Sequence, residues 1–559
     1  MIAGSTKPNI AAPIESQKLV DKIEPKKFDW KNLVLFTVVF SLACLTYFSW
    51  LDKFPLFNPD EALYAEPARE MNELGEYVTT YLNYQVRYTK PPLCIWAMAL
   101  AYKAFGATEW AARMFSAACG SILVGATYLL VQKYASKKTA LLAAMFLLTA
   151  PLYLASSKLA ITDIPLALFV TGSLFSFFHS YEQKLKSYKW LAWCLLGFGV
   201  MTKGPVAVIL VVAVLFFYHL INRDLWPALK YYNPITGALV VGAIALPWFC
   251  YEIYITKGEY YYAFLVRENL QRFTSVVDHK YPWWYHFAAM YGGFMPWSLL
   301  LPAAYFKFAR PSKPISPEAK LGLFAAVTSL VILLFFSSSV SKLLPYTLPA
   351  FPANAILAAL GVSYLLNKKI LWPVQVMFAG LCITAVAAVF LAPYIVDRIR
   401  DCPIALAYEI VGAAFLIGTV SFISLVASRV TKTLTPSLLA LSGLMVGCVV
   451  FAGPNAISIF NKDWEETPLS FVQYAANTSE PIVIYQVRKP SAPFYAKRKV
   501  EVIPDLPAMQ KAAPTLKSAY LIARTDKEPE LKSVLGNRFK IRVKQGRFML
   551  AQIEKTPGL

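Results

Sequence analysis

Two carboxylates and a cation near the start of the chain have types and spacing that suit phosphate chemistry. Asp60 and Glu61 lie in the stretch 58–66, just past the first long apolar run, and Lys90 precedes two prolines further along. An acid beside an apolar membrane segment is costly to leave in lipid, so it is expected to face water, a partner or a substrate. A carboxylate can act as a general base, and a cation held by stiff prolines can hold a phosphate. The pairing therefore predicts chemistry on a phosphate leaving group.

Polar residues in later loops could complete such a site. Asp163 begins another apolar run as a second acid. Lys203 lies between two apolar runs, where a half-buried lysine must be paired or touch an anion. Arg267 and Arg272 carry guanidinium groups, whose planar fork matches phosphate oxygens. The remaining candidates for holding phosphate or shaping the site are Tyr64, Arg87, Lys342 and Tyr346.

Structural roles compete with these assignments. Asn58 followed by a proline makes a good helix start, so Asp60 and Glu61 could simply cap an interfacial helix. A cap also accounts for Asp163 alone, and Lys90 could extend toward lipid headgroups. A cap explains less well why two acid-led helix starts face the same side.

The composition is that of a membrane protein. The chain has 559 residues, of which 57% are hydrophobic and 16% charged, with a net charge of +21. Several apolar runs are long enough to cross a bilayer, which takes roughly 20 residues each. The Lys and Arg residues concentrate in short loops between these runs, where they set membrane orientation, so nucleic acid is not expected as a partner. The eight Cys residues are scattered without zinc-like spacing and are expected to behave as small apolar residues.

The alternation of apolar runs and basic loops predicts about thirteen spans. The expected ranges are 33–50, 110–132, 139–155, 164–181, 188–201, 204–221, 234–255, 284–306, 320–337, 343–365, 370–393, 405–427 and 433–452. The Lys-rich tail at 1–32 should be cytoplasmic, and the basic loops then fall on the cytoplasmic side as well. An odd number of spans places the C-terminus outside.

The chain is expected to divide into a membrane domain at 33–454 and a soluble tail at 455–559. The first outer loop, 51–109, contains an apolar but short stretch at 92–106, which suits a helix lying in the membrane interface. In the tail, charge and proline content rise and strand-like runs appear. The clearest of these runs are 481–485 and 518–522. The tail is therefore expected to be a small α/β domain on the outer face.

Motifs for soluble donors and for metals are absent from the sequence. There is no Asp-x-Asp pair, no G-x-G-x-x-G and no P-loop, so nothing marks a nucleotide-sugar or ATP site. The donor of a transferase of this kind should therefore be carried by a lipid. No histidine pair has metal-ligand spacing, although Glu61, Asp278 and His279 could gather round an ion.

Several motifs in order resemble a known family. They are D-E-A-L-Y-A-E-x-A-R-E-M, L-N-x-x-x-R-Y-x-K-P-P-L, T-D-I-P-L-A, L-G-x-G-V-M-T-K-G-P-V-A, E-N-L-Q-R-F and S-K-L-L-P-Y-x-L-P-A. Together they are similar to the bacterial aminoarabinose transferases that modify lipid A. That family belongs to the membrane glycosyltransferases of the GT-C fold, which are related to protein O-mannosyltransferases. The resemblance covers roughly residues 30–365 by motif.

The resemblance implies a bacterial inner-membrane enzyme with a polyprenyl-phosphate-sugar donor. It also implies an acceptor on the outer (periplasmic) side, lipid A or a related envelope glycolipid, and inversion at the anomeric carbon. Asp60 corresponds to the family's first-loop acid, and Asp163 is the second acid. The positions that would hold donor phosphate or shape the cavity are Lys90, Lys203, Arg267, Arg272 and Tyr346.

Two departures from the family pattern bear on specificity and metal binding. This chain has Leu63 where the family commonly has Arg, and Thr89 where it commonly has Glu. Loss of that Glu removes a metal ligand or an acceptor contact. No cofactor is therefore expected to be required, and the aminoarabinose specificity is open.

Other functions remain as alternatives. A related enzyme could glycosylate proteins or other surface glycans. A flippase of lipid-linked sugars would also have many spans and charges within the membrane, but the chain has no inverted repeat and its unusual polar residues gather on one face. A structural scaffold would explain neither the acids nor the cations.

Overall fold

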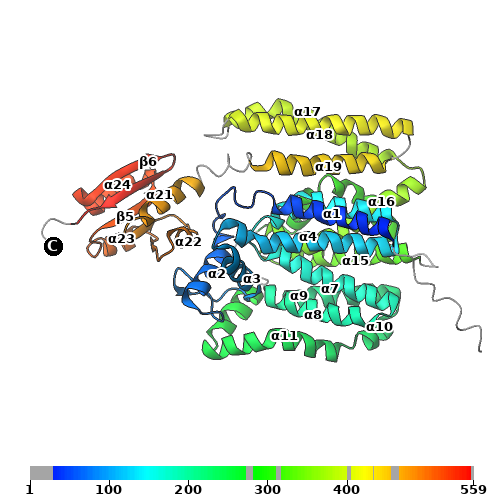
Figure 1. Cartoon of the computed structure of the whole chain (residues 1–559), viewed down its shortest axis with the longest axis horizontal. Helices are drawn as coiled ribbons and strands as arrows, with labels where there is room; N and C mark the ends of the chain where they lie inside the picture. Colours follow the sequence, from blue (N-terminus) through cyan, green and yellow to red (C-terminus); the bar gives the residue numbers. More distant parts are fainter. Residues whose placement is uncertain are drawn as a thin grey trace, which may run out of the picture.

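The fold is a helical bundle followed by a small sheet domain. The computed structural model describes residues 29–271, 281–309, 316–398, 404–431, 434–454 and 465–555. Arg272, Asp278 and His279, which are among the residues discussed above, lie outside these ranges. Figure 1 shows the long helices lying side by side, with the sheet domain beyond one end of the bundle.

The first half of the bundle is built from α-helices, which short turns join except between α1 and α4, where the first outer loop lies. Its helices are α1 (Trp30–Phe48), α4 (Glu109–Tyr134), α5 (Lys137–Thr149), α6 (Pro151–Ser157), α7 (Asp163–Gln183), α8 (Lys186–Lys203), α9 (Val206–Asn222), α10 (Leu225–Tyr232) and α11 (Pro234–Ile255). Side-chain caps fix several of their starts: Thr108 accepts the N–H of Ala111, and Ser136 accepts that of Thr139. Such caps satisfy N–H groups that the first helical turn leaves without partners.

The second half contains more short and irregular helices. They are the π-helix η1 (Tyr261–Gln271), α13 (Tyr285–Gly293), the 3-10 helix η2 (Trp297–Leu300), α14 (Leu301–Phe308), α15 (Pro317–Ser338), the 3-10 helix η3 (Leu344–Ala350), α16 (Phe351–Asn367), α17 (Trp372–Arg398), α18 (Ile404–Thr431) and α19 (Thr435–Phe451). A π-helix inside a helical protein often marks a functional site. In this chain η1 contributes to the cavity described below.

Each predicted span overlaps at least one of these helices, but not every one is a long, straight helix. In the described part of the chain, eight helices are long and apolar enough to cross a membrane, or nine if α5 and α6 form one bent span. The break between α5 and α6 bends the chain by 65°. Pro151 begins α6 there and lacks the N–H that a continuous helix would need. The number thirteen stays a prediction.

The first outer loop folds into two helices and a hairpin. They are α2 (Ala62–Leu74), α3 (Leu93–Phe105), β1 (Tyr81–Leu82) and β2 (Gln85–Val86). α3 matches the predicted helix at 92–106, and Tyr102 on α3 donates a hydrogen bond to the carbonyl of Ala65 on α2. Figure 1 shows α2 and α3 at the end of the bundle that faces the sheet domain.

The predicted α/β tail is confirmed. Its strands are β3 (Ile482–Tyr485), β4 (Glu501–Ile503), β5 (Ala519–Arg524), β6 (Phe539–Gln545) and β7 (Phe548–Ile553), in the order β4-β3-β5-β7-β6. Its helices are α21 (Thr467–Ala476), α22 (Ala492–Ala496), α23 (Leu506–Ala512) and α24 (Glu528–Leu535), with short 3-10 turns at Thr525–Lys527 and Gly536–Arg538. β3 pairs parallel with β4 and β5, whereas β7 pairs antiparallel with β5 and β6. The two strand-like runs predicted from sequence are β3 and β5.

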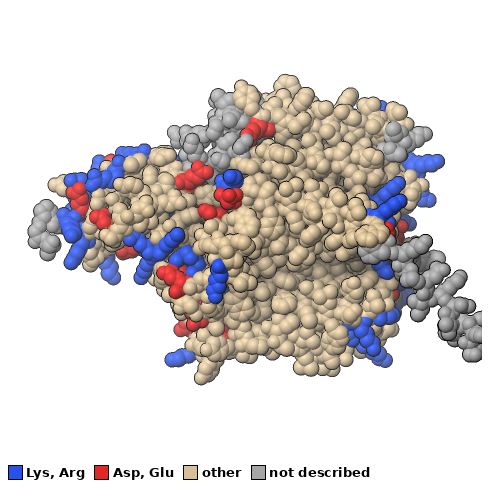
Figure 2. Space-filling view, viewed as in Figure 1, with Lys and Arg blue, Asp and Glu red and all other residues tan. Residues whose placement is uncertain are grey.

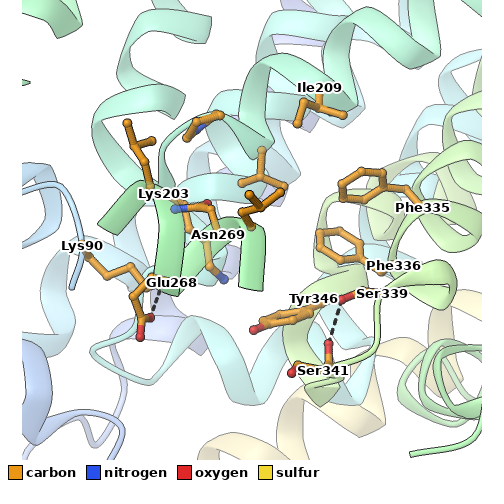
Figure 3. A pocket seen from close by; sticks show the side chains of 14 residues that line it. Lys90, Lys203, Ile209, Glu268, Asn269, Phe335, Phe336, Ser339, Ser341 and Tyr346 are labelled. Carbon is orange, nitrogen blue, oxygen red and sulfur yellow. Dashed lines mark hydrogen bonds and ion pairs between the residues drawn. The ribbon is translucent and has the colours of Figure 1, made fainter. Parts of the chain in front are cut away.

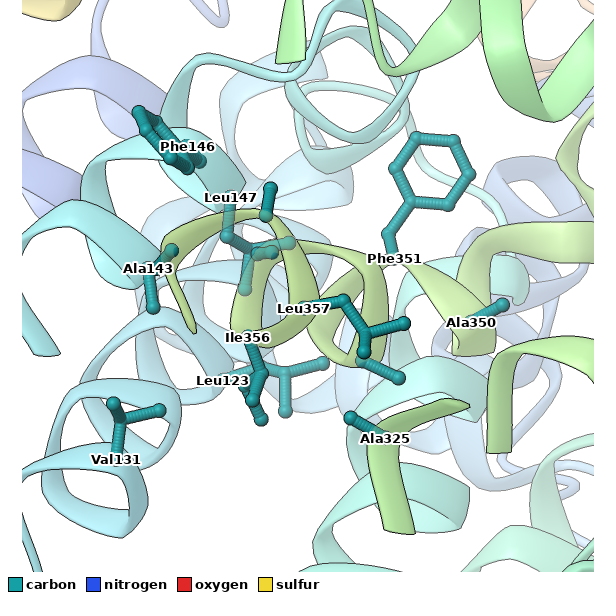
Figure 4. Close-up of a cluster of buried hydrophobic side chains, with 14 of the residues drawn as sticks. Leu123, Val131, Ala143, Phe146, Leu147, Ala325, Ala350, Phe351, Ile356 and Leu357 are labelled. Atoms are coloured by element: carbon teal, nitrogen blue, oxygen red, sulfur yellow. The ribbon is translucent and has the colours of Figure 1, made fainter. Parts of the chain in front are cut away.

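The core of the bundle surrounds α16. Figure 4 shows Ile356 and Leu357 of this helix among side chains of neighbouring helices, including Leu123 and Phe146. All four side chains are fully buried. Helices in a membrane associate mainly through close van der Waals packing, because lipid is as apolar as their side chains. A core packed on every side of α16 gives the site a rigid support.

Figure 2 shows a bundle surface whose middle carries no charged residues. Lys, Arg, Asp and Glu gather at its two ends. A broad uncharged band between two charged ends is what a membrane-embedded protein requires. The end away from the sheet domain is dominated by Lys and Arg. This distribution agrees with the basic loops from which the topology was predicted.

Candidate active site

A cavity of about 390 Å³ lies where the first outer loop meets the bundle. Its walls come from the loop before α3, from the α8–α9 turn, from η1, and from the ends of α15 and η3. The lining residues are Lys90, Lys203, Pro205, Val206, Ile209, Leu265, Glu268, Asn269, Leu270, Phe335, Phe336, Ser339, Ser341 and Tyr346. Figure 3 shows Lys90, Glu268 and Lys203 on one side of it and the two phenylalanine rings on another. One part of the cavity is therefore charged and the rest is largely apolar.

Lys203 is the last residue of α8 and forms an ion pair with the first residue of α7. Its Nζ lies 2.6 Å from Oδ1 of Asp163, and both side chains are mostly buried. The same Nζ lies 4.8 Å from the centre of the Tyr346 ring, a cation–π contact. The pair confirms the expectation that a lysine between two apolar runs would have a partner of opposite charge. It also brings together three of the predicted site residues.

A glycine makes the turn that presents Lys203. Gly204 has φ +79°, a left-handed conformation, and a Cβ there would lie 2.5 Å from the Phe264 ring of η1. Only glycine meets both conditions without strain. The turn leads directly into α9, whose first residues line the cavity.

Lys90 reaches the cavity from the first outer loop. Pro91 and Pro92 follow it, and Pro92 is the N-cap residue of α3. The Nζ atom of Lys90 lies 3.4 Å from Oε2 of Glu268 on η1. Both side chains are mostly buried, and this longer ion pair connects the first loop to η1 inside the cavity.

Tyr64 and Arg87 lie beside this group. The Arg87 guanidinium lies 5.9 Å from the centre of the Tyr64 ring and donates a hydrogen bond to the carbonyl of Leu63. Burial raises the pKa of the Tyr64 phenol, which also interacts electrostatically with Arg87, Lys203 and Asp163. Tyr64 is therefore within electrostatic range of both Arg87 and the Lys203–Asp163 pair.

The two adjacent acids of the first loop have different surroundings. Asp60 is exposed and lies one turn before Tyr64. Glu61 is fully buried, and its carboxylate forms an ion pair with Arg113 of α4 at 2.6 Å. It also accepts the backbone N–H groups of Phe57 and Ala160. Of the two, only Asp60 is open to solvent.

Two further candidates in the described part of the chain, Arg267 and Lys342, are not part of the cavity lining. Arg267 has an exposed side chain on η1, and Arg272 lies outside the described residues. Lys342 is buried and donates a hydrogen bond to the carbonyl of Ser339. Burial lowers the pKa of the Lys342 ammonium. Its neighbour in sequence, Ser341, lines the cavity.

Sequence reasoning missed two charged residues. Glu268 was part of a quoted motif, but its pairing with Lys90 joins segments far apart in the chain, which the sequence alone does not show. Arg113 was inside the predicted span 110–132, where a charged residue is costly and should have signalled a buried partner. That partner is Glu61.

Metal ligands do not gather within the described ranges, where no group of three His, Cys, Asp or Glu side chains is close enough to hold an ion. Thr89 stands where the resembling family commonly has Glu. Asp278 and His279 lie outside the described residues, so the ion considered with Glu61 is not tested.

The geometry suits an anion carried on an apolar tail. Two ammonium groups, Lys90 and Lys203, reach one region of the cavity, and Val206, Ile209 and Phe335 line apolar walls. A buried cation favours an anionic ligand strongly where water is excluded. A phosphate attached to a long hydrocarbon chain combines these two properties.

Comparisons with known proteins agree with this reading. Residues 30–256 match the family model described as dolichyl-phosphate-mannose-protein mannosyltransferase. An uncharacterized protein of Aquifex aeolicus is 31% identical over 61% of this chain and 68% of its own length. An undecaprenyl phosphate-alpha-4-amino-4-deoxy-L-arabinose arabinosyl transferase of Pectobacterium atrosepticum is 31% identical over 63% of this chain and 64% of its own. The matches thus span about two thirds of these relatives.

A solved structure shows the same fold over nearly the whole chain. The crystal structure of ArnT from Cupriavidus metallidurans bound to undecaprenyl phosphate superposes with a TM-score of 0.78 and 22% identity. The superposition covers 93% of this chain and 97% of that one. The GT-C fold predicted from the motifs, a polytopic α-helical domain with a C-terminal sheet domain, is therefore confirmed. In sequence the chain is similar to the aminoarabinose transferases, and it shares the fold of these multi-pass membrane glycosyltransferases.

Proposed function

We propose that this protein transfers a sugar from a polyprenyl-phosphate donor to an acceptor at the outer face of a bacterial inner membrane, with lipid A as the favoured acceptor. The observation that carries the proposal is the cavity in which Lys90 and Lys203 meet apolar walls. The names of the Pectobacterium relative and of the ArnT complex, which both mention undecaprenyl phosphate, support the choice of donor.

The lysines would bind the donor phosphate and stabilise its departure. As the bond between the anomeric carbon and the phosphate oxygen breaks, its electron pair stays on that oxygen and negative charge grows there. Lys90 and Lys203 would neutralise this charge, and preorganised groups of this kind contribute about 3–4 kcal/mol each in other enzymes. Arg87, beside Tyr64, would add a third positive charge nearby.

The two carboxylates would have different roles, one as the general base and the other as the ion-pair partner of Lys203. Asp60 is exposed at the start of α2 and would take the proton from the acceptor hydroxyl as its oxygen attacks the anomeric carbon. Attack opposite the departing phosphate inverts that carbon. Asp163 would hold Lys203 in place through their 2.6 Å ion pair.

The apolar walls would hold the start of the polyprenyl chain. Phe335 and Phe336 from α15 and Ile209 from α9 line the cavity opposite Lys90. Close van der Waals packing against these side chains would hold the first prenyl units, because the surrounding lipid is as apolar as the cavity walls. The rest of the lipid would remain in the membrane.

The orientation follows from charge. The Lys- and Arg-rich end of the bundle in Figure 2 would face the cytoplasm, and the sheet domain and the first outer loop would face the periplasm. The cavity would then open where lipid-linked sugars meet envelope acceptors.

The test is transfer by the purified protein from synthetic polyprenyl-phosphate sugars that differ only in the sugar, including 4-amino-4-deoxy-L-arabinose and mannose. The acceptors would be lipid A, a peptide mixture and buffer. Transfer to lipid A supports the proposal as stated. Transfer to peptide would show that the acceptor is a protein, as in the description of the matching family model. If no donor gives a product while the protein carries donor lipid across vesicle membranes, the flippase alternative replaces the proposal.

A further inference from the structure

One buried ion pair connects the two segments that carry the acids of the proposed site. Glu61 and Arg113 both have fully buried side chains. The Glu61 carboxylate accepts both Nε and Nη2 of Arg113, at 2.8 and 2.6 Å. This two-point contact fixes the orientation of both groups as well as their distance.

The carboxylate also holds the backbone on either side of the site. Glu61 Oε2 accepts the N–H of Phe57 at 2.9 Å, which closes the turn that carries Asp60. Its Oε1 accepts the N–H of Ala160 at 2.7 Å, three residues before Asp163. The four hydrogen bonds occupy both oxygens from several sides, and no solvent reaches them.

The guanidinium completes the connection. Arg113 Nη1 donates to the carbonyls of Leu51 and Phe54, at 2.6 and 2.9 Å, and Nη2 donates to that of Pro55 at 2.9 Å. Its Cζ lies 3.9 Å from the centre of the Phe54 ring. Arg113 thus anchors the loop before Asp60 to α4, a helix of the buried core.

We propose that Glu61 and Arg113 are positioning residues that fix the Asp60 segment relative to the Asp163 segment. Both side chains are fully buried and their polar atoms bind the protein itself, so neither is assigned a catalytic role. The inference rests on the proposed function, because it assigns Asp60 and Asp163 to the reacting site. A misplacement of about 1 Å in such a site can reduce the rate about 100-fold.

The Glu61→Gln variant tests the proposal. In this variant an amide N–H replaces one of the two oxygens that face Arg113. Only one oxygen then remains to accept the backbone N–H groups of Phe57 and Ala160. We expect kcat to fall about 100-fold, with the donor KM within about twofold of wild type, because the phosphate-binding lysines are untouched. Amide hydrogen exchange should rise in both segments, 51–61 and 158–163.

Two further variants separate positioning from general stability. Glu66→Gln alters another buried carboxylate that pairs with an arginine at two points, Arg69, in the same loop. It should lower the melting temperature while leaving kcat unchanged. The double variant Glu61→Gln/Arg113→Gln removes the unpaired charge and should recover melting temperature without recovering kcat.

Outcomes that overturn the proposal are distinct from those that overturn the function. Wild-type kcat in folded Glu61→Gln, or recovery of kcat together with stability in the double variant, would contradict positioning. So would unchanged exchange in either segment. If the wild type itself transfers sugar from no donor, the proposed function fails, and the exchange measurement still decides whether the pair connects the two segments.

Discussion

At the scale of single residues, the partners of each buried charge indicate its role. Lys203 has a carboxylate partner, Asp163, and a cavity in front of it, which suits a cation that exchanges part of its interactions for a ligand. Lys158 instead lies 2.8 and 3.0 Å from the carbonyl and hydroxyl of Ser49 and over the Trp50 ring. Its contacts are with neutral groups, and they suit structural support.

Replacing Lys203 by Gln should weaken donor binding. A hydrogen bond to a charged group contributes about 1.5–3 kcal/mol, so the Kd for polyprenyl phosphate should rise about 10- to 100-fold. Fluorescence titration with a short-chain polyprenyl phosphate would measure it. Lys53→Gln, at an exposed lysine of the first outer loop, is the control and should bind like wild type. Equal Kd values for both variants would remove Lys203 from the phosphate site.

Lys158 should make stability depend on pH. Burial lowers the pKa of its ammonium from 10.5 to about 7. Between about pH 7 and 10.5 the folded protein therefore binds fewer protons than the unfolded chain, and its free energy of unfolding should rise with pH. Melting temperatures of wild type and Lys158→Met across this range would test the sign. The wild type should gain stability relative to the variant as pH rises, and a constant difference would contradict the assignment.

At the scale of elements, breaks in helices shape the site. The turn from α8 to α9 presents Lys203, and η1 presents Glu268. Hydropathy located the apolar runs and loop charge located their ends, so the overlap with helices could be predicted from sequence. Local pattern could not predict the pairing of Lys90 with Glu268 or of Glu61 with Arg113, because each joins segments far apart in the chain. The neighbours Asp60 and Glu61 show the same limit: only packing against α4 distinguishes them.

Gly204→Ala tests the α8–α9 turn. The new methyl group would meet the Phe264 ring, and φ is +79°. Gly258 is the matched control, because its φ is +88° but nothing lies within 4 Å of a Cβ there. In both variants backbone strain should lower the free energy of unfolding by about 1 kcal/mol. In Gly204→Ala the contact with the Phe264 ring should lower it further and should also weaken donor binding. If Gly204→Ala and Gly258→Ala lose the same melting temperature and the same donor affinity, the contact with the Phe264 ring is unimportant.

At the scale of the whole molecule, the sheet domain is attached directly to the loop that carries Asp60. Asn58 exchanges hydrogen bonds with Ser491, at 2.8 and 2.9 Å, and donates to Glu465 at 2.6 Å. Asn83 at the β1–β2 turn pairs with the backbone of Val500 at 2.7 and 2.9 Å. The first outer loop is therefore held by the bundle on one side and by the sheet domain on the other.

Asn58→Ala combined with Asn83→Ala should loosen this attachment. Each lost hydrogen bond contributes about 0.5–1.5 kcal/mol, so amide exchange should rise in the first loop and kcat should fall with it. Asn477→Ala, at the end of α21, is the control and should change neither. If exchange rises while kcat stays at the wild-type value, the sheet domain does not contribute to the order of the site.

The central claim is that Asp60 accepts the acceptor's proton while the lysines of the cavity stabilise the polyprenyl phosphate that leaves the sugar. Single-turnover sugar transfer by wild type and Asp60→Asn, at saturating donor and acceptor, tests it most directly. The Asn variant keeps the shape of the side chain but cannot accept the proton. We predict a rate at least about 100-fold lower with donor Kd unchanged, as expected for loss of a general base. Transfer by folded Asp60→Asn at the wild-type rate would contradict the account.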